Sequence, residues 1–119
     1  MGLDMFAFET SETPEREVDF WRPMVVTKLH RWREHRHLHE WMEGLYRCKG
    51  GAFEEFNSVP VALTSQDLDE LETAIWRDEL PEWPDVVTDG SHDEDDMKFV
   101  RKARAVVSEG KTVFYVARW

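Results

Sequence analysis

Runs of strand-forming residues lie at the two ends of the chain, and the residues between them repeat mainly with helical spacing. Residues 3–8 are apolar except for Asp4, as in a strand that is buried on much of both faces. Residues 112–119 alternate and are rich in β-forming side chains. Terminal strands separated by helical segments predict an α+β fold in which helices cover one face of a small sheet.

A third, shorter strand is predicted at residues 59–63, where Val, Ala and Leu surround Pro60. Because proline cannot donate a ladder hydrogen bond, either this strand lies at an edge of the sheet or Pro60 is its first residue. The predicted sheet is therefore mostly antiparallel. It has about three strands (N-terminal, middle and C-terminal) packed with three to four helices.

Residues 15–46 favour helix but are interrupted at Pro23, which lacks a backbone donor and disfavours helical geometry in the residue before it. A helix is predicted to restart near Pro23. The pattern leaves open whether residues 24–47 form one helix or two that break near His35. The later part carries an apolar stripe and ends at a pair of glycines. The stripe consists of Leu38, Trp41, Met42 and Leu45.

Two further helices have recognisable ends. Thr64 or Ser65 is predicted to cap a helix that continues to about Glu79, with Leu68, Leu71 and Ile75 on one face. The segment Ser91-His92-Asp93-Glu94 is typical of a capping box, and the helix that follows should end at Gly110. Its apolar positions are Phe99, Val100, Ala103, Val106 and Val107.

Length and composition indicate one domain covering residues 1–119. No apolar run approaches the roughly 18 residues of a membrane span, and the start lacks the pattern of a signal peptide. Cys48 is the single cysteine and has no nucleophile signature around it. We expect a cytoplasmic monomer without membrane association, in which Cys48 is an ordinary thiol.

The net charge of −10 is distributed unevenly along the chain. The basic part, about residues 20–51, has seven Lys or Arg against three acids and also holds four histidines. The acidic part, about residues 54–96, has fifteen acids and one base. Such segregation predicts an electrically bipolar molecule, and self-repulsion within the acidic part suggests a use for it.

The acidic part supplies the candidate binding residues. Carboxylates at this density resemble a phosphate backbone in charge, so a nucleic-acid-binding protein could be attracted to them. The plainer interpretation is a solvated face that keeps a small protein soluble. The candidate partner-binding residues are Asp67, Asp69, Glu70, Glu72, Asp78, Glu79, Glu82, Asp85, Asp89, Asp93, Glu94, Asp95 and Asp96.

An alternative function rests on a basic, histidine-rich helix at residues 28–47. Its Lys and Arg side chains, interleaved with Trp32 and Trp41, could contact phosphates, and His35 and His39 lie one helical turn apart, as two metal ligands would. No third and fourth ligand are apparent, and the acidic part would repel a nucleic acid. We therefore expect no metal, no cofactor and no direct nucleic-acid binding.

Signatures of catalysis are missing from the sequence. It has no phosphate-binding glycine loop, nucleotide fingerprint, nucleophile elbow or kinase motif. Carboxylates are so numerous that no pair stands out as a general acid and base. We expect a binding protein and not an enzyme.

Short motifs lie along most of the chain, beginning with Gly-Leu-Asp-Met at residues 2–5 and a Trp-Arg element at 32–33 that precedes a Leu-His pair at 38–39. These motifs resemble those of a family of small proteins encoded by bacteriophages and bacterial mobile elements. The sequence departs from the family at residues 82–88, where relatives carry an aromatic, glycine-containing strand, so the sheet is expected to lack a strand there. The matching residues are 2–5, 32–33, 38–42, 45–47, 49–51, 56–57, 59–61, 63–64, 89–91, 94–96 and 110–115.

Within that phage setting, a small acidic protein with one basic part is similar to an anti-CRISPR protein acting on a type I effector complex. The resemblance implies a stoichiometric inhibitor of host defence. Its partner would be a bacterial defence protein or a CRISPR effector subunit with a positively charged DNA-binding surface. The resemblance implies neither a cofactor nor turnover.

Overall fold

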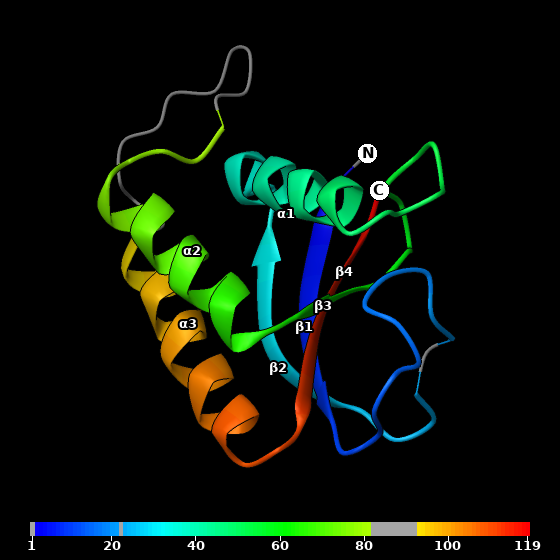
Figure 1. The fold of residues 1–119 in the computed structure, drawn as a ribbon. Coiled ribbons are helices and arrows are strands. Elements are labelled where there is room, and N and C mark those ends of the chain that lie inside the picture. Colours follow the sequence, from blue (N-terminus) through cyan, green and yellow to red (C-terminus); the bar gives the residue numbers. More distant parts are fainter. Residues whose placement is uncertain (1, 22, 82–92) are drawn as a thin grey trace.

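A computed structural model of the 119-residue chain describes residues 2–21, 23–81 and 93–119. They form one antiparallel sheet of four strands packed with three helices (Figure 1). The strands are β1 (Asp4–Thr10), β2 (Thr27–Arg33), β3 (Val61–Leu63) and β4 (Thr112–Arg118). The helices are α1 (Arg36–Cys48), α2 (Ser65–Trp76) and α3 (Asp93–Ser108). The predicted α+β class is confirmed.

The strand order is β2-β1-β4-β3, so the two terminal strands pair at the centre of the sheet. Their apolar runs suit this position: residues 113–117 of β4 are buried on both faces, and β1 buries the face that turns toward the helices. The short strand β3 lies at one edge, directly after Pro60. This confirms the restriction that the missing proline donor imposes.

The helix predicted to restart near Pro23 is wrong for residues 27–33, which form strand β2 at the other edge of the sheet. His30 and Trp32 are buried there, whereas Arg31 and Arg33 are exposed. This alternation has the period of a strand, but the buried positions hold a histidine and a tryptophan whose polar atoms meet acids of α3. The sheet consequently has four strands and not about three.

Between β2 and α1 the chain turns at Glu34, whose backbone is left-handed with φ of 57°. Of the two arrangements predicted for residues 24–47, the one with a break near His35 is closer to the structure, because α1 begins at Arg36. The α1 stripe is only partly buried: Leu38 and Met42 are fully enclosed, and Trp41 packs at its margin. Gly50, with φ of 90°, follows the end of α1.

All three helices pack on one face of the sheet, where α2 and α3 lie side by side and α1 crosses near both termini (Figure 1). Thr64 caps α2 through a capping box with Asp67, which confirms one of the two predicted caps. The core joins the helix-facing side chains of β1 to the apolar faces of the helices. Its fully buried members include Leu3, Met5, Leu38, Met42, Tyr46, Leu68, Leu71, Phe99, Val100 and Tyr115.

The opposite face of the sheet is covered only in part. Phe20, from the segment before β2, packs edge-on against Phe114 of β4 with ring centroids 5.6 Å apart. Phe6 and Phe8 of β1 remain partly exposed beside it. Among the described residues, none of the helices has the length and apolar character needed to cross a membrane.

Candidate functional site

Asp67, one of the predicted partner-binding acids, is buried with 7% of its surface exposed. Its carboxylate accepts a hydrogen bond from the Thr64 backbone amide at 2.8 Å and closes the capping box of α2. The Lys49 ammonium, beyond the end of α1, forms an ion pair with the same carboxylate. Asp67 therefore holds two helices in place and contributes no exposed charge.

Asp96 is the most deeply buried of the predicted acids, with 1% of its surface exposed. The Trp32 indole donates a hydrogen bond to one carboxylate oxygen at 3.0 Å, and His35 Nε2 lies 2.8 Å from the other. These contacts connect β2, the residue before α1 and the first turn of α3. Asp96 is a structural group in the interior.

Three further predicted acids reach the surface but have partners within the chain. Arg104 of α3 forms ion pairs with Asp69 at 2.7 Å and with Glu72 at 3.0 Å, which links α3 to α2. Asp95 lies 3.0 Å from His30 Nε2 while keeping about half of its side chain exposed. The Arg104 charge therefore partly neutralises Asp69 and Glu72.

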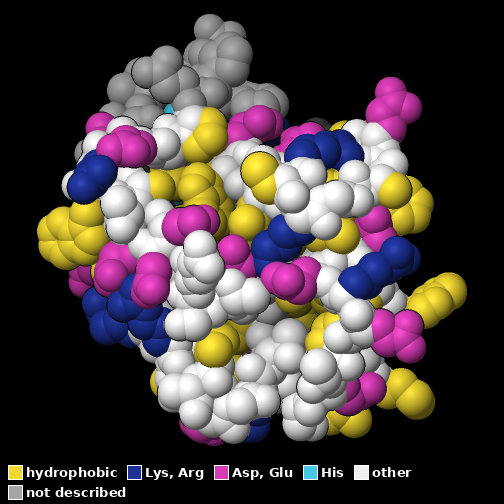
Figure 2. Space-filling view, in the orientation of Figure 1, with side chains coloured by type: hydrophobic (Ala, Val, Ile, Leu, Met, Phe, Trp, Pro, Cys, Tyr) yellow, Lys and Arg dark blue, Asp and Glu magenta, His cyan; other side chains and the backbone are white. Residues whose placement is uncertain are grey.

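Of the remaining described acids, Asp78, Glu79, Asp93 and Glu94 are exposed where α2 ends and α3 begins, and Glu70 is exposed earlier on α2. The two helices are antiparallel, so a shallow pocket of about 230 Å³ is lined jointly by Trp76 of α2 and by Asp93 and Glu94 of α3. Figure 2 shows acidic side chains over this side of the molecule, with basic side chains among them. Together with Asp69, Glu72 and Asp95, we call these acids the acidic helical surface; it comprises Asp69, Glu70, Glu72, Asp78, Glu79, Asp93, Glu94 and Asp95.

A larger hollow of about 450 Å³ lies between α1 and α2. Glu70, Glu79 and Asp69 line it together with the partly buried ring of Trp41. The hollow therefore combines an apolar wall with carboxylates. Sequence periodicity identified each helix but could not show that α1 would lie beside the acids of α2.

Trp76 is a candidate contact residue that sequence reasoning missed. It follows directly after the buried stripe of α2 and has 75% of its surface exposed. Tryptophan is rarely left so exposed, and it is enriched among the residues that contribute most to protein interfaces. The available signal was its position outside the Leu68, Leu71 and Ile75 stripe.

Glu82, Asp85 and Asp89 lie outside the described residues. So do the departure from the family pattern at 82–88 and Ser91, the first residue of the predicted capping box. Asp93, two positions later, is the first residue of α3.

The four histidines of the basic part, which include the His35 and His39 pair considered as metal ligands, are buried beside different partners. His37 Nδ1 lies 2.8 Å from the Pro81 carbonyl oxygen, and His39 Nδ1 lies 2.8 Å from the Tyr115 hydroxyl. Within the described ranges, no three His, Cys, Asp or Glu side chains form a group that could hold a metal ion. Burial, followed by the nearby Arg36 charge, lowers the pKa of His39 to about 4.

The basic segment is divided between two elements and does not form one helical face. Arg31 lies on β2, where it pairs with Asp4 at 3.4 Å and sits over the Phe6 ring. Arg47 lies on α1 and donates to the Phe53 and Glu54 carbonyl oxygens. A binding surface made from a single helix 28–47 is therefore incompatible with the fold.

Comparison with known proteins identifies no relative of this chain. No protein-family model, no curated protein and no solved structure matches the chain.

Proposed function

We propose that the protein is a non-catalytic inhibitor that binds a positively charged, nucleic-acid-binding surface of a bacterial defence complex. The acidic helical surface is the contact. Its carboxylates occupy the charge positions that a nucleic-acid backbone would otherwise fill, so inhibitor and nucleic acid compete. The action is stoichiometric and needs no cofactor.

The observation that carries the proposal is the set of exposed carboxylates along α2 and at the junction where α2 ends beside the start of α3. Glu70, Asp78 and Glu79 lie on or just after α2, and Asp93 and Glu94 begin α3. The antiparallel packing of the helices places the end of one beside the start of the other. Such a local field accelerates association with a basic partner and weakens with added salt.

Trp76 and the hollow beside Trp41 supply an apolar component that charge mimicry alone would lack. Exposed Trp76 lies next to Asp93 and Glu94 and would anchor the partner by burial. Charges at the rim then determine orientation and on-rate more than affinity. The surface thus has the composition of a protein interface.

The setting proposed for this inhibitor is a bacteriophage or mobile element, and the target proposed is a type I CRISPR effector. Both rest on the sequence resemblance. The acidic helical surface supports the proposed target on the ground of charge, since the DNA-binding channel of a CRISPR effector is basic.

Charge reversal tests the proposal. The variant E70K/E79K should weaken binding to a purified type I effector by about tenfold or more, because two exposed carboxylates become repulsive. Binding is measured by biolayer interferometry, and competition with target DNA by a mobility shift. W76A should weaken binding without changing its salt dependence. Asp67 is unsuitable for this test because its reversal would disrupt the α2 cap.

The matched control is E54K/E55K, which makes the same charge change at exposed acids outside the acidic helical surface. It should bind as the unmodified protein does. Equal losses in the two double variants, or unchanged binding of E70K/E79K at physiological salt, would contradict the proposal.

A further inference from the structure

The open face of the sheet carries aromatic rings beside a row of basic side chains. In the strand register Arg31 is opposite Phe6 and Lys28 is opposite Phe8. Residues directly opposite each other in antiparallel strands project on the same face. Arg33 of β2 lies opposite Asp4 by the same register.

Two of the rings form a flat, accessible platform. Phe6 and Phe8 are partly exposed, their centroids are 5.9 Å apart, and their planes differ by 24°. Phe8 also stacks on buried Phe114 at 5.5 Å, which fixes its position from the neighbouring strand β4. The platform is therefore supported by the central strands and not by a loop.

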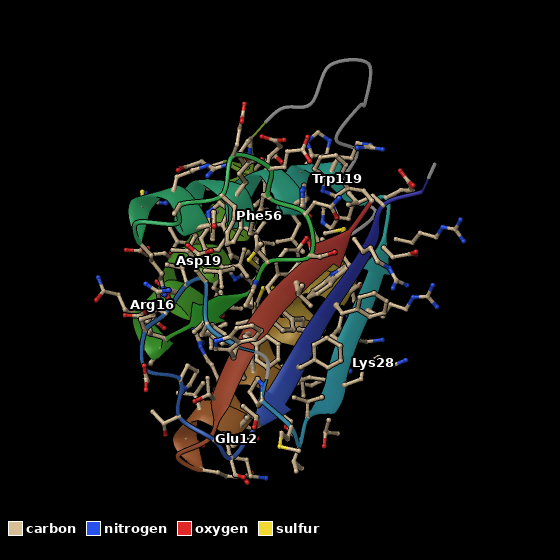
Figure 3. The ribbon with its side chains drawn as sticks, turned by 90° about the vertical axis from the view of Figure 1, so that its right-hand side faces the viewer. Glu12, Arg16, Asp19, Lys28, Phe56 and Trp119 are labelled. Atoms are coloured by element: carbon tan, nitrogen blue, oxygen red, sulfur yellow. The ribbon has the colours of Figure 1, made fainter. Side chains whose placement is uncertain are left out.

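The basic row is available for a ligand. Lys28 and Arg33 are exposed, and no acidic side chain in residues 2–21, 23–81 or 93–119 lies within ion-pair distance of either. Arg31 sits over the Phe6 ring at 5.8 Å and is half exposed despite its contact with Asp4. Lys28 projects outward at the β2 edge of the sheet (Figure 3). Each of the two rings on β1 thus lies beside a cation on β2.

We propose that this open face binds single-stranded nucleic acid. Two successive bases stack on Phe6 and Phe8, while Lys28, Arg31 and Arg33 contact the phosphates. Antiparallel sheets with exposed aromatic rings bind unpaired bases in this way, and stacking tolerates any sequence. A duplex does not fit, because its bases are already stacked on one another.

The overall negative charge does not prevent such binding. The acidic helical surface belongs to α2 and α3, which pack on the other side of the sheet (Figure 1). At physiological ionic strength charges are screened over about 8 Å, less than the roughly 10 Å that separates packed layers. The local field at β2 comes from its lysine and arginines together with two nearby acids: Asp4, which pairs with Arg31 at 3.4 Å, and Asp95, which lies 3.0 Å from His30 on the helix side. Three cations on β2 outnumber these two acids.

Fluorescence anisotropy of the full chain with labelled oligothymidylate and oligouridylate, each of about ten nucleotides, tests the inference. F6A and F8A should each weaken binding by about tenfold, whereas F6W, which preserves a stacking surface, should retain it. K28E/R33E should abolish binding. For the unmodified chain, affinity should fall with salt with a logarithmic slope of about −2, as expected for three phosphate contacts.

Matched controls change the same residue types elsewhere. W76A removes an exposed ring from α2, and K98E/R101E reverses two exposed charges on α3. Both should bind the oligonucleotides normally, as should E70K/E79K, since the inference does not depend on the proposed function. Circular dichroism melts establish that each variant is folded.

Three results would overturn the inference. The first is no binding of either oligonucleotide at low salt, and the second is equal affinity for duplex. The third is a concentration-dependent dimer, seen by sedimentation and lost in K28E/R33E, without oligonucleotide binding. That outcome would assign the face to a second copy of the chain.

Discussion

Asp95 and Asp96 are adjacent in the sequence, yet their side chains have different roles. The Asp95 side chain is 49% exposed and meets His30, whereas that of Asp96 is 1% exposed and meets Trp32 and His35. One residue is a 100° step around a helix, which is sufficient to move a carboxylate from the surface into the interior. Composition alone treats the two as equal members of an acidic run.

Replacing Asp96 by alanine should lower the free energy of unfolding by about 2–4 kcal/mol, because the buried Trp32 indole loses its acceptor and His35 loses its contact with the carboxylate. Urea unfolding monitored by tryptophan fluorescence measures the change. E94A is the matched control on the same helical turn, where the side chain is exposed, and it should cost less than about 1 kcal/mol. Similar losses in the two variants would show that the buried network contributes little.

His39 is a second residue whose environment changes its chemistry. It is 7% exposed, and burial together with Arg36 lowers its pKa from 6.5 to about 4. The unfolded chain binds a proton near pH 6.5, but the folded chain does so only near pH 4. Stability is therefore lost as the pH falls through this interval, by up to about 3 kcal/mol.

The variant H39Q should remove this component of the pH dependence, because glutamine does not titrate and can still hydrogen-bond the Tyr115 hydroxyl. Free energies of unfolding at several pH values between about 4 and 7 measure it. An NMR titration of the His39 ring gives the folded-state midpoint directly. A midpoint near the ordinary value, or an identical pH slope in H39Q, would refute the assignment.

At the scale of elements, β2 shows where periodicity fails. Its inward positions hold His30 and Trp32, and its outward positions hold Lys28, Arg31 and Arg33. Together these residues do not form a recognisable apolar face in the sequence, so the sequence predicts the segment to be part of a basic helix. Pairing with β1 and hydrogen bonds to α3 outweigh the local preference.

Helix α1 contains a glycine that its environment does not require. Gly44 is exposed in the helix interior, and an added Cβ would meet nothing within 4 Å. G44A should raise the free energy of unfolding by about 0.5–1 kcal/mol, because alanine loses less backbone entropy on folding. The measurement is the shift of the urea or thermal midpoint.

The matched control for this helix is G51A. A Cβ on Gly51 would lie 2.3 Å from ring atoms of the fully buried Tyr46, so the substitution must displace a core side chain. It should lower stability as G44A raises it. Stabilisation by both substitutions would contradict the close contact.

At the scale of the whole molecule, the acidic helical surface and the basic side chains of β2 lie on opposite sides of the sheet. The helices hold the acidic helical surface, and the open face carries the basic row of β2. Some of the opposite charges are used internally, as in the Arg104 pairs with Asp69 and Glu72. The two proposed surfaces therefore belong to different layers and can be altered independently.

The sequence by itself determined the α+β class, the two terminal strands, a short strand beside Pro60 and a cap of α2 at Thr64 or Ser65, because these signals act locally. Only the tertiary structure decided that residues 27–33 form a strand and which carboxylates reach the surface. Those outcomes depend on pairing with β1 and on burial against residues more than sixty positions away, such as Asp96 for Trp32. Local patterns contain no information about such contacts.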